Sequence, residues 1–250
     1  MSYIIENGDN LTILVTNDDG YSKGLEMLLK AAKQIDEAYA VIPSTHQSAV
    51  SSSITLHKAL RFNEHSEDIY TLSGSPADCV LFSLYSNELK KPNLILSGVN
   101  FGDNSTAGGI VCSGTVGACW VAAVESVPSI AFSLYIRDRE AWKDKSNWGD
   151  EKVIVPLLVK LIQELKPQCE KGALFSVNMP IDPSKSKIIF SSKLQEKRFD
   201  TTFEKRIDPR GEPYYWCGGG FAKPKEGTDY YEVSYNHNIV ITKISTDFVK

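Results

Sequence analysis

Apolar and polar residues follow one another in blocks that predict alternating strands and helices. Residues 11–16 form an apolar run that ends at the turn sequence NDDG at 17–20, which predicts a buried strand followed by a turn. From Gly24 onward apolar residues recur at helical spacing, which predicts a helix packed on a sheet. Further strands are expected at 38–42, 54–62, 70–72, 93–97, 129–134 and 173–177, and further helices at 114–125 and 151–165. Another helix is expected from Pro76 at its first position, with Ser75 as its N-cap and a helical apolar pattern over 79–89.

This alternation predicts an α/β fold with a Rossmann-like, mostly parallel sheet and helices on both faces. Residues 44–53 and the glycine-rich stretch 98–113 are expected to be loops. After about Pro180 the sequence turns to proline, glycine, aromatic residues and alternating segments at 230–234 and 239–244, which favours β-hairpins. We therefore expect one domain over residues 1–250, with a core at about 11–180 and a β-rich C-terminal extension at about 181–250 that mediates oligomerisation.

Composition narrows the possible functions. The 250 residues are 42% hydrophobic, enough to bury a sizeable core. A net charge of -4 argues against a stable complex with nucleic acid, because such proteins need a basic surface. No apolar run is long enough for a membrane span, and residues 1–10 do not resemble a secretion signal. The expected location is the cytoplasm.

Cysteine and histidine residues show no spacing that indicates a site. The five cysteines form no CxxC pair and make an odd count, which favours reduced thiols. Cys112 is not followed by the CxxxxxR loop that a cysteine phosphatase needs. The four histidines show neither HxxxH nor HExxH spacing, so each is expected at the surface or in packing, although His46 lies in a polar loop near the candidate site.

An acidic pair follows the first predicted strand. In open α/β sheets ligands bind beyond the carboxyl ends of the strands, and Asp18 and Asp19 stand at such an end. Two adjacent carboxylates repel each other unless a cation lies between them, and oxygen ligands suit Mg²⁺ or Mn²⁺. The alternative is that one aspartate caps the next helix while the other is solvated. The position directly after the first strand favours the metal site.

A second polar cluster follows the strand predicted at 93–97. Asn100 and Asn104 lie in the glycine-rich stretch, and the sequence SGT at 113–115 opens the next predicted helix. A helix N-terminus with nearby hydroxyl groups favours phosphate, although serine and threonine also cap helices without binding any ligand. The chain contains no GxxxxGK[ST] motif and no GxGxxG after its first strand, so neither a P-loop nor a dinucleotide site is supported.

Together these motifs resemble the SurE (survival protein E) family of 5'/3'-nucleotidases. The resemblance rests on ILVTNDDG at 13–20, Pro43 with Ser48, GSPADC at 74–79, SGVNFGDN at 97–104, SGT at 113–115, DPRG at 208–211, Tyr215-Trp216 and Thr228-Asp229. It implies that Asp18, Asp19, Ser48 and Asn100 hold a divalent metal. It also implies that Asn104, Ser113, Gly114 and Thr115 contact the phosphate.

The resemblance further implies a metal-dependent phosphomonoesterase that acts on nucleoside 5'- and 3'-monophosphates. The expected cofactor is one Mg²⁺ or Mn²⁺ per subunit, and the expected assembly is a homodimer or homotetramer. Asp18 and Asn104 are the expected catalytic residues. Asp18 either attacks phosphorus itself, which we favour, or activates a water molecule. Two alternative functions are a receiver-like phospho-switch and a non-catalytic nucleotide-binding scaffold.

Overall fold

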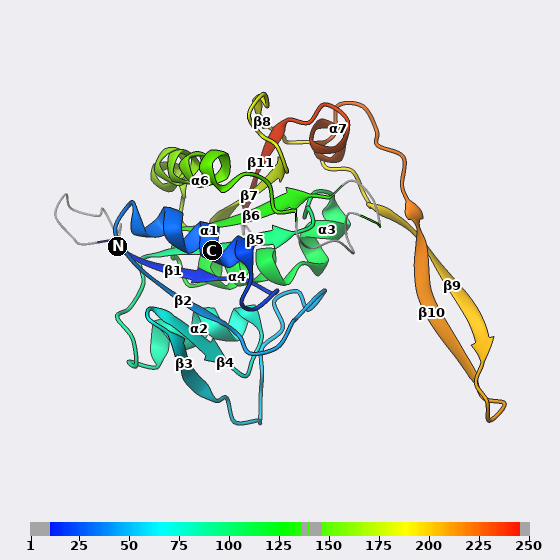
Figure 1. The fold of residues 1–250 in the computed structure, drawn as a ribbon, viewed down its shortest axis with the longest axis horizontal. Helices are drawn as coiled ribbons and strands as arrows, with labels where there is room; N and C mark the ends of the chain where they lie inside the picture. Colours follow the sequence, from blue (N-terminus) through cyan, green and yellow to red (C-terminus); the bar gives the residue numbers. More distant parts are fainter. Residues whose placement is uncertain (1–10, 137–139, 141–146, 246–250) are drawn as a thin grey trace.

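A nine-stranded sheet runs through the computed structural model, which describes residues 11–136, 140 and 147–245 (Figure 1). Its order is β3-β4-β2-β1-β5-β6-β7-β11-β8. The six central strands each pair in parallel with their neighbours among the six. In spatial order they are β4 (Ile69–Leu72), β2 (Glu37–Pro43), β1 (Thr12–Thr16), β5 (Leu94–Phe101), β6 (Ser129–Tyr135) and β7 (Ala173–Pro180). At the edges, β3 (Phe62–Ser66) and β11 (Ile239–Ser245) pair antiparallel with β4 and β7, and β8 (Ile188–Phe190) pairs parallel with β11. The predicted α/β class with a mostly parallel sheet is confirmed.

Helices cover both faces of the sheet (Figure 1). Helices α1 (Lys23–Lys33) and α6 (Glu151–Leu165) pack on one face, and α2 (Pro76–Tyr85) and α4 (Gly114–Val124) pack on the other. Strand β1 shows why its sequence is a continuous apolar run. Ile13 and Val15 belong to the core under α1 and α6, whereas Leu14 belongs to the core under α2 and α4. Successive side chains of a strand point to opposite faces, and here both faces are buried.

Two helix starts form as the sequence indicates. Ser75 accepts a hydrogen bond from the backbone of Asp78, and the Asp78 carboxylate accepts from the backbone of Ser75, which completes a capping box at α2. Helix α2 begins at Pro76, directly after the predicted cap at Ser75, and ends at Tyr85, before the predicted end at Leu89. Helix α6 has the predicted bounds, and α4 differs from its predicted range by one residue.

Two predicted segments near the middle of the chain are wrong. Residues 54–61 form no strand, because Thr55 turns its backbone and hydroxyl toward Asp78 and His57 has a positive φ of 60°. The stretch 98–113 is not one loop. Strand β5 continues to Phe101, and helix α3 (Ala107–Cys112) begins where the Thr106 hydroxyl accepts from the backbone of Gly109.

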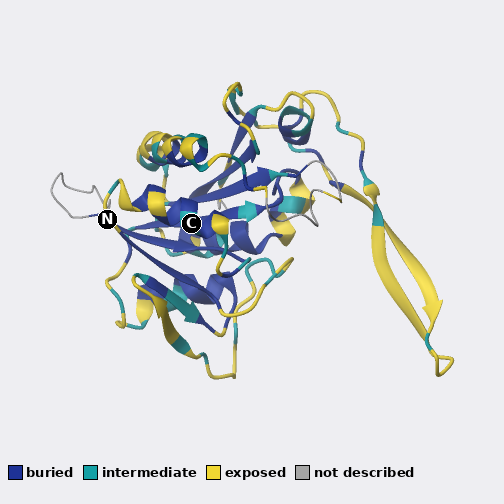
Figure 2. Cartoon of the chain, in the orientation of Figure 1, coloured by how far each residue is buried: buried dark blue, intermediate teal, exposed yellow. Residues whose placement is uncertain are grey.

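The C-terminal region combines a projecting hairpin with elements of the main sheet. Strands β9 (Phe199–Ile207) and β10 (Pro213–Phe221) form an antiparallel arm that extends away from the body (Figure 1). The arm is exposed along almost its whole length, in contrast to the buried central strands (Figure 2). The segment predicted as β at 230–234 is instead helix α7 (Asp229–Ser234), capped by the Thr228 hydroxyl. Strand β11 then returns to the main sheet.

The base of the arm is fastened to the loop that follows β5. The side chain of Arg198 lies 2.6 Å from the Asp103 carboxylate, and the side chains are 6% and 0% exposed. Arg198 also donates to the backbone oxygens of Asp103 and Ile136, each at 3.2 Å. The Asp229 carboxylate accepts from the backbone of Thr106 at 2.6 Å and of Gln195 at 2.8 Å. We call these contacts the arm clamp.

The arm clamp predicts an asymmetric response to mutation. Arg198→Met should lower the free energy of unfolding by about 3–5 kcal/mol, because it leaves the buried Asp103 carboxylate without a positively charged partner. Adding Asp103→Asn in the same chain should recover part of that loss, since the unpaired charge is gone. Urea denaturation followed by circular dichroism measures both. Arg206→Met serves as the control, because Arg206 pairs with Glu204 on the exposed arm and should change nothing measurable. Equal stability of Arg198→Met and wild type would refute the clamp.

Candidate metal and phosphate site

The candidate site lies where β1 and β5 run side by side. The two strands pair in parallel, so their carboxyl ends meet at one edge of the sheet. After β1 the chain passes to α1 on one face, and after β5 it passes through α3 to α4 on the other. Such a point of divergence leaves a crevice for ligands at the strand ends. Asp18 and Asp19 directly follow β1, and Asn100 lies at the end of β5.

Asp18 is buried at the centre of this edge. The residue is 6% exposed, and its carboxylate accepts a hydrogen bond of 2.6 Å from the hydroxyl of Thr115 in the first turn of α4. A Cβ on Gly114 would lie 3.0 Å from the Asp18 Cβ, so glycine lets the helix approach closely. Burial raises the pKa of Asp18 to about 6, with a further contribution from the charge of Asp19 that the Thr115 hydrogen bond opposes. The ionised form therefore lacks compensating positive charge.

The turn after β1 is held by its own side chains. Asn17 donates to the backbone oxygen of Gly20 at 2.7 Å and accepts from the backbone of Gly20 at 3.0 Å. Gly20 has a positive φ of 75°, which explains the glycine that closes the turn. Ser22 caps α1 by accepting from the backbone of Leu25 at 3.2 Å. Neither aspartate caps this helix and Asp18 is not solvated, so the alternative explanation of the acidic pair is wrong.

A loop carrying Ser48 folds back over the same edge. The backbone of Gln47 donates to the backbone oxygen of Asp18 at 2.8 Å, and Ser51 donates to Val111 and Cys112 near the end of α3. His46 lies between the two proposed ligands of this region: its Nδ1 is 3.3 Å from the Asp19 carboxylate, and its Nε2 is 2.5 Å from the Ser48 hydroxyl. The sequence prediction set His46 aside, because its neighbours are determined by the fold and not by spacing.

The two asparagines have different environments. Asn100 is partly exposed, and its side chain donates to the backbone oxygen of Gly102 at 2.6 Å, which leaves its own carbonyl oxygen as an acceptor for a cation. Asn104 is buried, and its side chain donates to the Ser133 hydroxyl at 2.8 Å. One of its two amide hydrogens is thus already used. The backbone of Asn104 donates to Asn178 at 2.7 Å, which fixes the loop after β5 to the end of β7.

The hydroxyl groups at the start of α4 already have partners in the protein. Ser113 accepts from the backbone of Val116 at 3.0 Å and so caps α4, as the alternative interpretation of this motif expects. Thr115 is fully buried and points at Asp18. Asp18 is thus hydrogen-bonded to Thr115 and packed closely against Gly114. The side chain of His46 contacts both Asp19 and Ser48. The hydrogen bonds described above do not link the side chains of Asn104 and Ser113 to Asp18, Asp19 or Ser48.

The residues at this edge fit a hard divalent cation. They offer carboxylate, hydroxyl and amide oxygens, the donor types that Mg²⁺ and Mn²⁺ prefer. A cation would also supply the positive charge that the buried Asp18 lacks. Among the residues that the structure describes, no three or more His, Cys, Asp or Glu side chains converge into a metal-binding group. A cation at this edge would therefore depend on the neutral oxygens of Ser48 and Asn100 as well as on the two aspartates.

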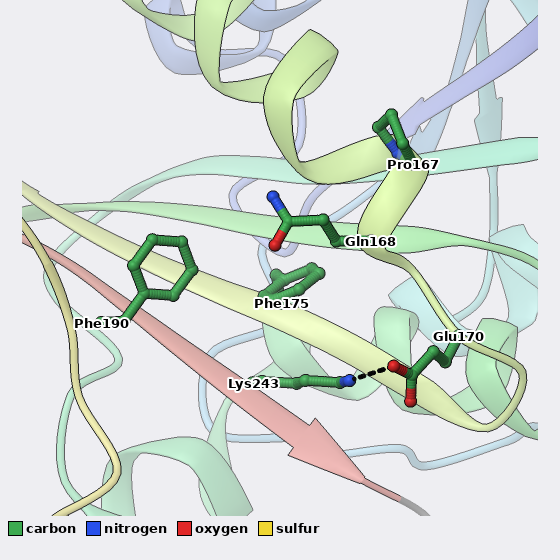
Figure 3. A pocket seen from close by; sticks show the side chains of 6 residues that line it. All are labelled: Pro167, Gln168, Glu170, Phe175, Phe190 and Lys243. Carbon is green, nitrogen blue, oxygen red and sulfur yellow. Dashed lines mark ion pairs between the residues drawn. The ribbon is translucent and has the colours of Figure 1, made fainter.

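A separate hollow of about 300 Å³ lies elsewhere on the molecule (Figure 3). Gln168 and Glu170, on its rim, precede β7, so the hollow lies at the amino end of that strand. Phe175 lies in it, and Lys243 forms a 2.8 Å ion pair with Glu170 across it (Figure 3). The two charged side chains of the hollow thus neutralise each other, and none of the candidate site residues lines it.

Comparison with known proteins identifies the family to which this chain belongs. The family model described as Survival protein SurE matches residues 13–201. The chain belongs to the SurE family. A relative named 5'-nucleotidase SurE from Thermofilum pendens is 37% identical over 94% of this chain and 90% of its own length. One of the same name from Methanopyrus kandleri is 37% identical over 95% and 92%.

Structural comparison confirms the SurE fold. The crystal structure of the SurE protein from Aquifex aeolicus matches with a TM-score of 0.77 at 30% identity, covering 94% of this chain and 93% of that chain. Within the described part of the chain, no helix is both long and apolar enough to cross a membrane.

Gly117 of α4 provides a test of how the Ser48 loop is seated. A Cβ at this position would lie 2.2 Å from the backbone oxygen of Ser51. Gly117→Ala should therefore displace the loop and cost about 1–3 kcal/mol, although alanine normally stabilises a helix interior. Thermal denaturation should show a Tm lower by about 2–4 °C for each kcal/mol. Gly218→Ala, which meets nothing within 4 Å, should leave the Tm unchanged. A Tm for Gly117→Ala at or above wild type would contradict this packing.

Proposed function

We propose that this chain is a metal-dependent 5'-nucleotidase that hydrolyses nucleoside monophosphates to nucleoside and phosphate. The observation that supports it most is the convergence of three segments on the end of β1: the turn with Asp18 and Asp19, the Ser48 loop and the start of α4. The names of the SurE relatives give the substrate class. Activity on 3'-monophosphates stays a prediction from the family resemblance.

In this proposal Asp18, Asp19, Ser48 and Asn100 hold one Mg²⁺ or Mn²⁺ in each subunit. Bound there, the cation would neutralise charge on the phosphate during transfer. The free backbone N–H groups at the start of α4, at Gly114 and Thr115, favour the phosphate anion. The remaining amide hydrogen of Asn104 would hold a further phosphate oxygen. Ser113 contributes mainly by capping α4, since its hydroxyl already accepts from Val116.

Asp18 is the residue that we propose to react. Its carboxylate is held by Thr115 and stands at the strand end next to the helix N-terminus that would receive phosphate. The segments that form the site, residues 17–22, 43–56 and 97–117, contain neither lysine nor arginine. Stabilisation of negative charge must therefore come from the cation and from backbone amides. A non-catalytic scaffold with the same residues would bind nucleotide without releasing phosphate.

The arm is proposed to join two copies of this chain into a homodimer, or two such pairs into a homotetramer. In the register of β9 and β10, Phe203, Ile207 and Tyr215 lie on one face of the hairpin. All three are more than half exposed, at 70%, 58% and 58%. A two-stranded hairpin with an apolar face is marginal in water by itself and gains stability when that face is covered.

Phosphate release from a panel of nucleoside 5'- and 3'-monophosphates tests the proposed activity. Wild-type protein should release phosphate with Mg²⁺ or Mn²⁺, lose that activity after chelation and regain it when the metal is restored. Asp18→Asn should reduce turnover by about 100- to 1,000-fold or more, because the charge that holds the metal or reacts is lost. Ser113→Ala should reduce it only about tenfold, the effect of losing a neutral cap.

Full activity of a metal-stripped sample would exclude the metal role. Wild-type turnover of Asp18→Asn, with its fold confirmed by circular dichroism, would exclude the assigned site. Nucleotide binding without phosphate release by the metal-loaded wild type would instead support the scaffold.

Sedimentation tests the role of the arm. Wild-type protein should sediment as a dimer or tetramer at micromolar concentration. Phe203→Ser combined with Tyr215→Ser should shift it toward monomer, because both changes remove apolar surface from one face. Glu204→Ser combined with Arg206→Ser changes the opposite face and should leave the assembly intact. A monomeric wild type, or a double variant on the apolar face that assembles normally, would count against the proposed interface.

A further inference from the structure

His46 lies between two proposed metal ligands on different segments, the Asp19 carboxylate and the Ser48 hydroxyl. Asp19 belongs to the turn after β1, and Ser48 belongs to the loop that follows β2. The imidazole contacts both, with Nδ1 3.3 Å from the Asp19 carboxylate and Nε2 2.5 Å from the Ser48 hydroxyl. Both ring nitrogens thus face a proposed metal ligand, while the ring itself is half exposed.

The chemistry of these two neighbours determines where the ring proton lies. An ionised carboxylate only accepts hydrogen bonds, so the nitrogen that faces Asp19 is the one that carries the proton. In the neutral ring the other nitrogen then accepts, and the donor available to it is the Ser48 hydroxyl. With its proton turned toward His46, the Ser48 oxygen directs its lone pairs away from the ring. A hydroxyl oriented in this way is ready to act as an oxygen ligand.

We propose that His46 is a positioning residue that couples Asp19 to Ser48 and presents the Ser48 oxygen to the divalent metal, an inference that rests on the proposed function. Residues that orient metal ligands in this way change metal affinity by about 10- to 100-fold when they are removed.

His46 acts in this proposal through Ser48 and Asp19 and is not itself a ligand. Both ring nitrogens already have protein partners at 2.5 and 3.3 Å. In the described part of the chain, no three His, Cys, Asp or Glu side chains are placed so that they could hold a metal. The Ser48 loop also needs an anchor at this point. It is fastened at Gln47 to the backbone of Asp18, but the Ser48 side chain is exposed and otherwise free to rotate.

Binding of Mn²⁺, followed by electron paramagnetic resonance of the free ion, tests the proposal without reference to turnover. His46→Ala should raise the Kd for Mn²⁺ about 10- to 100-fold. His46→Gln should lie closer to wild type, because an amide still offers one donor group and one acceptor. The matched control is His237→Asn, a histidine before β11 that should not change the Kd. An unchanged Kd in His46→Ala, or nitrogen coupling from an imidazole bound directly to Mn²⁺, would overturn the proposal.

A second measurement needs no metal. In metal-free wild-type protein, nitrogen NMR of the neutral imidazole should show the proton on Nδ1. A proton on Nε2 would overturn the role of His46 even if Mn²⁺ binds. If instead the proposed metal site is wrong, a different pattern is expected. Wild type and Asp18→Asn would then bind Mn²⁺ equally weakly, although the proton of His46 would still be found on Nδ1.

Discussion

The parallel pairing of β1 with β5 is the constraint on which the rest of the site depends. It brings the turn at Asp18 and the end of β5 at Asn100 to one edge of the sheet. The chain then leaves these strands toward opposite faces, because α1 packs with the core around Val15 and α4 packs with the core around Leu14. In open α/β sheets, ligands bind at such a point of divergence. The acidic pair lies at this point because it directly follows β1.

The arm clamp gives the same edge a second support. The loop after β5 contains Asn104, and its neighbours Asp103 and Thr106 are bound by Arg198 and Asp229 from the C-terminal region. The arm begins at Phe199, directly after Arg198. Force on the arm in an assembly would therefore reach the loop of Asn104 through one buried ion pair and one short hydrogen bond. In the proposed assembly this route would connect the arm to the loop of Asn104, a proposed phosphate contact, whereas the proposed metal ligands depend on β1, the end of β5 and the Ser48 loop.

The sequence predicts most of the elements that are long and periodic. Helix α6 and the start of α4 can be predicted from local sequence patterns alone. Asp18 and Asp19 can be singled out because they directly follow a predicted strand. The misjudged segments are short or depend on distant contacts. Thr55 forms no strand because Asp78, far along the chain, binds it. Helix α7 has six residues, too few for alternation to be told from helical spacing, although the capping hydroxyl of Thr228 is a local signal for it. His46 becomes visible only when the fold places its ring beside Asp19.

The electrostatic environment of Asp18 supports the proposal that this site holds a cation. Burial and the neighbouring Asp19 raise the pKa of Asp18 to about 6, so its ionised form is held at an energetic disadvantage. Thr115 offsets part of this, but a single neutral hydroxyl does not replace a positive charge. The nearest basic residue along the chain, Lys23, is bound to Glu151 at 2.7 Å, and Arg198 is bound to Asp103. A phosphate dianion brought to this edge would add further negative charge. In the proposed site, a metal between the carboxylates and the phosphate would resolve both problems at once, and the placement of the proposed neutral ligands Ser48 and Asn100 would then be decisive for its binding.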